Sequence, residues 1–331
     1  MPIRSPLLHL SLALTIAATL LAGLGGCGSS DTTTTTLGAK PVKKLAFVTN
    51  LSADFWNIAK AGIDAAIAEM PGYTVEFRVG DGTAAKQKEI VEDLLVKGVV
   101  GIAISPVDAG NQTAMLNDAA GKALVVCQDS DAPQSKRAFY LGTDNISAGR
   151  AAGALIKEAL PAGGRIMVFV GKKDQQNAKE RFQGLNEALV GSSISVIDLR
   201  ADDGDRARAK ANAADTLVKY PDIAGMVGLW AYNAPAIFSV LKDADRLTKV
   251  QVVSFDEEDD TLAGIAAGTV HGTVVQQPYE FGYQSMKLMA KYLSGDTAFL
   301  TPEKLIYVPT QTITAGNVAG FRTKLQQVRG K

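Results

Sequence analysis

The chain has 331 residues, and 34 lysines and arginines balance 34 aspartates and glutamates, so its formal net charge is zero. A neutral chain is poorly suited to nucleic acid, which favours a basic protein surface, and we expect no nucleic-acid partner. Hydrophobic residues make up 47% of the chain. About 290 residues follow the first forty, which is enough for two lobes that each bury a core.

The first 27 residues have the pattern of an export signal with a lipid-attachment site. Arg4 precedes an apolar run over residues 7–24, and Leu24-Gly25-Gly26-Cys27 resembles a bacterial lipobox. In proteins with a lipobox, the cysteine becomes the first mature residue and carries lipid. We therefore predict a signal peptide over residues 1–26, followed by a lipidated Cys27 and a flexible tether that end at residue 40. The alternative is an uncleaved signal anchor, because the apolar run is near the length that spans a bilayer.

The first half of the folded part alternates apolar strands with amphipathic helices. The predicted strands cover residues 45–48, 75–79, 99–104, 124–127 and 139–141. The predicted helices follow Asp54, Thr83 and Asp108, and Asp108 is the expected N-cap of the third helix. This β-α-β-α order predicts a parallel sheet with helices on both faces.

The pattern restarts at Asn145 with a helix that runs to residue 160. Further strands are predicted over residues 166–170, 194–199, 227–229, 250–255 and 270–275, with helices between them. A helix after Pro278 and a last strand over residues 305–308 follow this second set. The chain therefore reads as two α/β lobes, and the extra elements indicate that it crosses back between them.

The predicted strands end in side chains that suit a polyhydroxylated ligand, at the sheet edge where α/β proteins bind ligands. Carboxylates and amides exchange hydrogen bonds with hydroxyl groups, and arginine offers a fixed fork of donors. Aromatic faces pack on the apolar face of a sugar ring. The candidates found in this way are Asn50, Phe55, Trp56, Asp129, Arg181, Trp230, Tyr232 and Asp256.

Each candidate also has a purely structural interpretation. Phe55 with Trp56, and Trp230 with Tyr232, are equally suited to anchoring a core. The two aspartates are equally well placed to be helix N-caps, but we favour the site because both follow fully apolar strands. Arg181 alternatively is a solvated charge on a helix.

From about Lys44 to Val308 the chain resembles the periplasmic sugar-binding proteins of ABC importers, in particular the ribose-binding type. The order and spacing of several short motifs carry this resemblance. The motifs are residues 45–56 with their aromatic pair, Asp129, Gly142-Thr143-Asp144-Asn145, Ala178-Lys179-Glu180-Arg181 followed by Gly184, Val253-Ser254-Phe255-Asp256 and Val275-Gln276-Gln277-Pro278.

The resemblance implies two doubly wound parallel-sheet lobes joined by a three-stranded hinge, the type I periplasmic binding protein fold. We expect a first lobe over residues 41–143 and 278–304 and a second over 144–277 and 305–325, with crossings near Asp144, Gln277 and Leu305. The cleft between the lobes would be lined by Phe55, Trp56, Asp129, Arg181, Asp256 and Gln276.

Three departures from the ribose type make ribose itself a less favoured ligand. Ser130 stands where an arginine is common, Ala53-Asp54 replaces an Asn-Pro, and residues 230–233 differ from the usual loop. Asn177 or Asn233 is the candidate for the missing amide contact.

The expected function is capture of a sugar or polyol by hinge closure, followed by delivery to an ABC permease in the membrane. We expect a monomer that is exported, anchored by the lipid on Cys27, and faces the periplasm or the cell exterior. The alternatives are a sensor protein that presents its ligand to a chemoreceptor or kinase, and a binder of a non-sugar molecule such as a nucleoside. A sugar-responsive transcription regulator would need a DNA-binding segment where the tether stands.

Catalysis, metal binding and cofactor binding are not expected. His271 follows a Gly268-Thr269 turn rather than a strand end, so a catalytic triad has no place for it. No phosphate-binding loop of the G-x-x-x-x-G-K-[ST] type is present. The acidic run at residues 257–260 is better explained as the first turn of a helix than as a metal site. We expect Cys127 to be a small buried apolar residue.

Overall fold

The structure is a computed structural model that describes residues 42–329. The predicted signal peptide, Cys27 and the tether lie outside the described residues. Over the range that is described, no helix is both long enough and apolar enough to cross a membrane.

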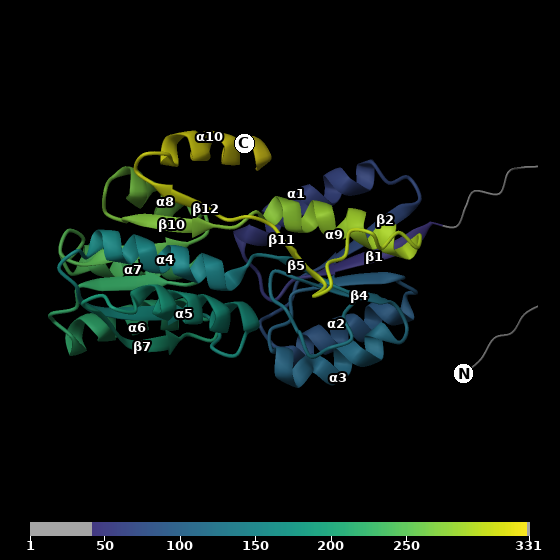
Figure 1. Cartoon of the computed structure of the whole chain (residues 1–331), viewed down its shortest axis with the longest axis horizontal. Helices are drawn as coiled ribbons and strands as arrows, with labels where there is room; N and C mark the ends of the chain where they lie inside the picture. The colour runs from purple at the N-terminus through teal and green to yellow at the C-terminus, as the bar shows by residue number, and fades with distance from the viewer. Residues whose placement is uncertain (1–41, 330–331) are drawn as a thin grey trace, which may run out of the picture. The chain divides into compact units, whose positions relative to one another are not determined.

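The first lobe is built on a sheet of six parallel strands (Figure 1). Its strands are β1 (Lys43–Val48), β2 (Tyr73–Arg78), β3 (Gly101–Ile104), β4 (Leu124–Gln128), β5 (Tyr140–Gly142) and β11 (Leu305–Tyr307). Its helices are α1 (Asp54–Ala68), α2 (Ala84–Val96), α3 (Ala109–Ala120) and α9 (Pro278–Leu293). The strand order is β11-β5-β4-β3-β1-β2.

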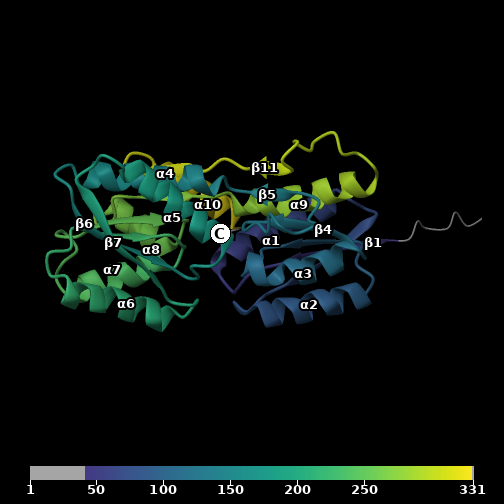
Figure 2. The same ribbon diagram turned by 60° about the horizontal axis from the view of Figure 1, so that its bottom comes forward.

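Strand β1 shows how the sequence places helices on both faces of this sheet. Leu45 and Phe47 join the core that contains α1 and α9, whereas Ala46 and Val48 join the core that contains α2 and α3. All four side chains have no exposed surface. Because successive side chains of a strand point to opposite faces, a continuous apolar run requires cover on both sides, and Figure 2 shows it.

The second lobe repeats this plan with one change. Its strands are β6 (Gly164–Val170), β7 (Ile194–Ala201), β8 (Gly225–Gly228), β9 (Gln251–Phe255), β10 (Gly272–Val275) and β12 (Gln311–Thr314). Its helices are α4 (Asn145–Ala159), α5 (Gln176–Leu189), α6 (Arg206–Lys219), α7 (Asn233–Asp243), α8 (Asp259–Ala266) and α10 (Val318–Val328). The strand order is β12-β10-β9-β8-β6-β7, and β12 pairs antiparallel with β10.

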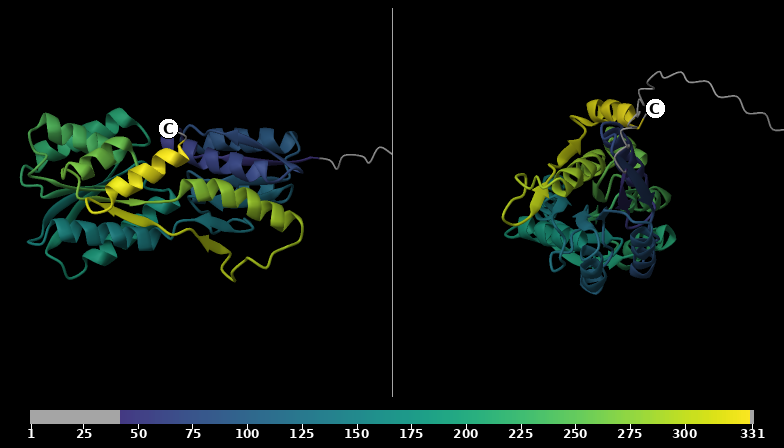
Figure 3. Two further views of the ribbon diagram at one scale, coloured as in Figure 1. Left: turned by 90° about the horizontal axis from the view of Figure 1, so that it is seen from above. Right: turned by 90° about the vertical axis from the view of Figure 1, so that its right-hand side faces the viewer.

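Three segments of chain connect the lobes. Residues 143–144 lead from β5 to α4, residues 276–277 lead from β10 to α9, and residues 308–310 lead from β11 to β12. Two of these segments are bonded to each other, because the Gln277 side chain donates to the backbone oxygen of Pro309 at 2.8 Å. Figure 3 shows α10 after the third crossing, with its last turn close to α1.

The last part of the chain differs from the prediction. Strand β11 pairs with β5 in the first sheet, so residues 305–307 do not belong to the second lobe as predicted. The third crossing therefore lies at residues 308–310 rather than near Leu305. Strand β12 and helix α10 were missed because the strand is polar and only Val318 and Leu325 are buried in the helix.

Candidate functional site

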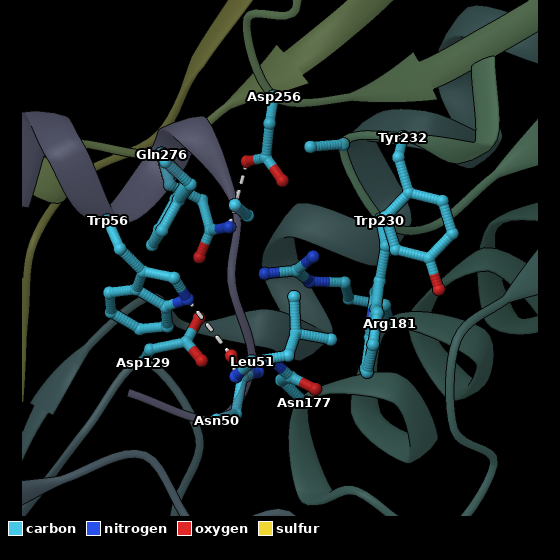
Figure 4. A pocket seen from close by; sticks show the side chains of 13 residues that line it. Asn50, Leu51, Trp56, Asp129, Asn177, Arg181, Trp230, Tyr232, Asp256 and Gln276 are labelled. Atoms are coloured by element: carbon cyan, nitrogen blue, oxygen red, sulfur yellow. Dashed lines mark hydrogen bonds between the residues drawn. The ribbon is translucent and has the colours of Figure 1, made fainter. Parts of the chain in front are cut away.

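A cavity of about 50 Å³ lies where strand ends of both lobes meet. This is several times the volume that one water molecule requires, and it suits a small ligand. Figure 4 shows the side chains around it. The lining residues are Asn50, Leu51, Ala53, Phe55, Trp56, Asp129, Asn177, Arg181, Trp230, Ala231, Tyr232, Asp256 and Gln276.

The two aspartates occupy equivalent positions in the two lobes. Asp129 directly follows β4 and Asp256 directly follows β9. Both have a left-handed backbone, with φ of 60° and 65° respectively. Aspartate tolerates this conformation better than most residues do. Neither is a helix N-cap, since the N-cap of α8 is Glu258 and no helix follows β4 directly, so the capping alternative is wrong.

Burial sets the protonation behaviour of both carboxyl groups. Burial raises the pKa of Asp129 to about 6, although the nearby Arg181 and a hydrogen bond from Ser105 oppose the shift. The Ser105 hydroxyl donates to Asp129 Oδ2 at 2.6 Å. Burial also raises the pKa of Asp256 above its ordinary value, against the opposing effect of Arg181. The cavity therefore holds two carboxyl groups that water solvates poorly.

Asp256 is connected to the crossings between the lobes. Gln276 Nε2 donates to Asp256 Oδ1 at 2.8 Å, and the Thr143 hydroxyl donates to Gln276 Oε1 at 2.9 Å. Thr143 and Gln276 stand on two different crossing segments. The orientation of the Gln276 amide is thus fixed from both sides.

Arg181 is a buried side chain, and the alternative of a solvated helix charge is wrong. Its side chain is only 1% exposed. Its Nε donates to Asn145 Oδ1 at 2.9 Å, and its Nη1 donates to the backbone oxygen of Leu229 at 2.8 Å. The guanidinium also lies 4.4 Å from the centre of the Phe255 ring. Its Nη2 has no partner within residues 42–329, and Figure 4 shows the guanidinium projecting into the cavity.

The aromatic pair of α1 lines the cavity and also anchors the core. Trp56 Nε1 donates to Asn50 Oδ1 at 3.0 Å, and this oxygen also accepts from the backbone nitrogen of Leu51 at 2.7 Å. The rings of Phe55 and Trp56 meet edge to face at 4.9 Å, and Phe47 packs on Trp56 from the core side. The core interpretation of this pair is therefore confirmed, and the ligand-binding one stays a prediction.

In the loop after β8, the residues that line the cavity differ from the predicted ones at one position. Trp230 and Tyr232 line the cavity, but Asn233 does not. The Asn233 side chain accepts from the backbone nitrogen of Trp230 at 2.9 Å and donates to Asp202 at 3.1 Å. Asn233 therefore lies behind the loop. Asn177 lines the cavity and its Oδ1 has no partner in the described chain, so Asn177 remains the candidate for the amide contact.

Three lining residues were missed by the sequence interpretation, namely Leu51, Ala53 and Ala231. They carry no polar group or aromatic ring, so their type gives no signal. Their positions beside Asn50, Phe55 and Trp230 were the only available indication.

The other groups considered from the sequence lie outside the cavity. His271 faces Glu158 at 3.6 Å. Of the acidic run at residues 257–260, only Asp259 and Asp260 lie in the first turn of α8, whereas Glu258 is its N-cap and Glu257 is buried before the helix, so the prediction is confirmed for half of the run. Residues 42–329 contain no cluster of three or more His, Cys, Asp and Glu side chains that could hold a metal ion. Cys127 is fully buried and burial raises the pKa of its thiol, so its reactive thiolate form is suppressed.

The sequence model of a family described as a periplasmic binding protein domain matches residues 45–297, which is well over half of the chain. The chain belongs to this family of periplasmic binding proteins. The resemblance found in the motifs is thereby confirmed. The two-lobe architecture also agrees with the solved structures described next.

Relatives of this periplasmic binding protein share about a quarter of its residues. The ribose import binding protein of Bacillus subtilis is 27% identical over 266 residues, which is 80% of this chain and 86% of that protein. The crystal structure of GanP, a glucose-galactose binding protein from Geobacillus stearothermophilus, has a TM-score of 0.79 at 26% identity and covers 84% of this chain and 99% of that one. An ABC transporter solute binding protein from Burkholderia graminis was solved in complex with D-arabinose. It matches with a TM-score of 0.78 at 26% identity, and the match covers 84% of this chain and 96% of that one.

Proposed function

We propose that this protein is the substrate-binding component of an ABC importer and holds a sugar or a sugar-like polyol between its lobes. The observation that carries the proposal is the lining of the cavity. Two buried carboxyl groups, a guanidinium with an unpartnered Nη2 and two aromatic pairs face one small space. The names of the relatives support a sugar over other small molecules, because they refer to ribose, glucose-galactose and arabinose.

Each lining group has a role that suits a ring with several hydroxyl groups. Asp129 and Asp256 accept hydrogen bonds from hydroxyl groups, and Arg181 donates to hydroxyl or ring oxygens. The amide side chains of Asn177 and Asn50 provide further hydrogen-bonding groups, one from each lobe. Phe55, Trp56, Trp230 and Tyr232 supply faces for the C–H side of the ring.

Binding closes the two lobes about the three crossings. The contacts come from both lobes, so a ligand held by all of them favours the closed arrangement over an open one. The closed protein then presents its cargo to a membrane permease as a monomer, and the lipid on Cys27 keeps it near that membrane. The protein itself performs no chemistry on the sugar.

A thermal unfolding screen tests the ligand class. The soluble chain from Lys40 onward is heated with pentoses, hexoses, polyols, nucleosides and amino acids in turn. A ligand at a hundred times its dissociation constant adds about 2.7 kcal/mol of stability, which shifts the unfolding midpoint visibly. A shift with a sugar or polyol supports the proposal. A shift with a nucleoside or amino acid alone supports the alternative cargo and contradicts the sugar.

Asp256→Asn tests the site with that ligand. Asparagine tolerates the left-handed backbone but removes the charge, so we expect a loss of affinity of about 10- to 100-fold in calorimetry. Asp245→Asn is the matched control, because Asp245 is exposed, lies outside the cavity and has a similar φ of 54°. Equal affinity in both variants would remove Asp256 from the site.

Cys27→Ala in the full chain tests the lipid anchor. In a bacterial host with lipoprotein processing, the wild type should take up labelled fatty acid and lose residues 1–26, and the variant should do neither. A wild type that takes up no fatty acid and keeps residues 1–26 would favour the uncleaved signal anchor.

A further inference from the structure

One side of the cavity is formed by Trp230 and Tyr232, which we call the aromatic wall. Both side chains are more than nine-tenths buried, and their rings meet edge to face with centroids 6.2 Å apart. Residues 229–232 carry the wall between β8 and α7. Backbone hydrogen bonds hold both ends of this loop, from Leu229 N to the Phe169 oxygen and from Ala236 N to the Tyr232 oxygen, but they do not orient the two rings. The position of the rings therefore depends on side-chain contacts as well.

Those contacts converge on Asp202, which follows β7. The Tyr232 hydroxyl donates to Asp202 Oδ1 at 2.5 Å, and Asn233 Nδ2 donates to Asp202 Oδ2 at 3.1 Å. The backbone nitrogen of Gly204 also donates to Oδ1, at 2.9 Å. Asp202 is 1% exposed and is not among the residues that line the cavity.

Asn233 extends the effect of Asp202 to the tryptophan. Its Oδ1 accepts from the backbone nitrogen of Trp230 at 2.9 Å while its Nδ2 donates to Asp202. One carboxylate thus holds the ring of Tyr232 directly and the backbone of Trp230 through a single amide. In Figure 4 the Tyr232 hydroxyl points away from Arg181, which leaves the face of the ring for the cavity.

Neighbouring residues leave the two rings of the aromatic wall little room to take another position. A Cβ atom on Gly171 would lie 2.0 Å from Trp230 Cζ3 and 2.7 Å from the Tyr232 hydroxyl, so the rings fit only against glycine. The Arg206 guanidinium lies 5.2 Å from the centre of the Tyr232 ring.

Burying a carboxylate costs free energy, so it is not expected at a purely structural position. Burial raises the pKa of Asp202, and its hydrogen bonds, that of Tyr232 first, oppose this shift. Only a carboxylate offers two acceptor oxygens and no donor, which is what three converging donors require. The arrangement satisfies the donors behind the wall and leaves the wall itself fixed.

We propose that Asp202 is a positioning residue that orients the aromatic wall and thereby sets how tightly the cavity holds its ligand. This inference rests on the proposed function of the cavity. It assigns a binding role to a side chain that does not itself touch the ligand.

The first test reads the wall directly and needs no ligand. The chain has two tryptophans, so a Trp56→Phe background leaves Trp230 as the only one. Asp202→Asn replaces one acceptor oxygen with an amide NH₂ group, which faces the donors of its neighbours, so at least one of the three hydrogen bonds is lost. We therefore expect acrylamide to quench Trp230 fluorescence severalfold more effectively in this variant. Asp203→Asn is the matched control, because Asp203 is the exposed neighbour, pairs with Arg208 and is not part of the cavity.

The second test measures affinity for D-ribose, D-arabinose and D-galactose by calorimetry in chains that keep Trp56. We expect Asp202→Asn to weaken binding of a recognised sugar about tenfold. The effects of Asp202→Asn and Tyr232→Phe should add only in part, because both disturb the set of hydrogen bonds that Asp202 accepts. If Asp202→Asn fails to fold, Tyr232→Phe alone should increase the quenching.

Two results would overturn the inference. Unchanged quenching and affinity in a folded Asp202→Asn variant with a lower unfolding midpoint would make Asp202 merely structural. Fully additive effects would show that it does not act through Tyr232. If no sugar or polyol of the unfolding screen binds the wild type, the proposed function is contradicted, while the quenching experiment still decides the role of Asp202.

Discussion

Asp129 is a buried carboxyl group that lines the cavity, and its burial carries an electrostatic penalty. Its carboxyl group is buried, its backbone is left-handed, and its pKa is raised although Ser105 and Arg181 favour the charged form. A residue that only stabilised the fold would not be expected to combine these features. These features support the proposal that Asp129 binds the ligand.

The pH dependence of stability should reveal this penalty. The folded-state pKa of about 6 lies above the ordinary value of 3.8, so the folded state binds more protons between these values. Stability contributed by Asp129 is thus present at low pH and is lost as pH rises through 6. Asp129→Asn removes this loss, so the ligand-free variant should be more stable than the wild type at neutral pH, by at most about 3 kcal/mol.

Urea unfolding of both chains at about pH 7 and about pH 4 measures this difference. The advantage of Asp129→Asn should shrink as the pH falls. An advantage that is the same at both pH values, or one matched by the exposed control Asp245→Asn, would contradict the assignment.

At the scale of elements, close helix contacts decide where the cavity residues lie. A Cβ atom on Gly149 of α4 would lie 2.2 Å from the backbone oxygen of Arg181, and one on Gly184 of α5 would lie 2.0 Å from that of Ile146. The backbones of α4 and α5 therefore touch at glycine, and Gly184 fixes the depth at which α5 holds Arg181. The pair α1 and α9 repeats this contact at Gly282 in the first lobe.

Gly184→Ala should separate α4 from α5. We expect a loss of stability of about 1–3 kcal/mol from overpacking, together with weaker ligand binding because Arg181 moves. Gly320→Ala in α10 is the control, because nothing lies within 4 Å of its added Cβ and the helix should gain about 0.5 kcal/mol. Equal effects of the two substitutions in urea unfolding would mean that the close contact is unimportant.

At the scale of the whole molecule, a chain of hydrogen bonds joins the cavity to the hinge. Thr143 and Gln276 lie on separate crossings, and Gln276 also reaches Asp256. A ligand bound to Asp256 is therefore two hydrogen bonds away from the segments about which the lobes turn. In the proposed mechanism, ligand recognition and lobe closure therefore depend on one network of hydrogen bonds.

Thr143→Val keeps the shape of the side chain and leaves Gln276 Oε1 without its donor. We expect a loss of about 1–2 kcal/mol in the closed form, which weakens ligand binding about 5- to 30-fold. Thr269→Val, which removes a hydrogen bond to Gly264 within the second lobe, should leave affinity unchanged. Unchanged affinity in Thr143→Val would separate the hinge from recognition.

The strands and helices up to β11, the two α/β lobes, and the aspartates, the arginine and the aromatic residues that line the cavity could be predicted from the sequence. This was possible because apolar runs specify buried parallel strands, and the carboxyl ends of such strands meet at one edge. The sequence also predicted the N-cap Asp108, whose side chain accepts from the backbone nitrogen of Asn111.

Which polar residues near the cavity face it could not be predicted, because this depends on the fold. Asn233 and Asp202 lie 31 positions apart and bond to each other behind the aromatic wall, whereas the sequence placed Asn233 in the cavity and gave no role to Asp202. The tertiary structure also decided that β11 completes the first sheet. The physical reason is that periodicity and capping are local properties of the chain. The direction of a polar side chain and the sheet that accepts an edge strand depend on partners brought together by folding.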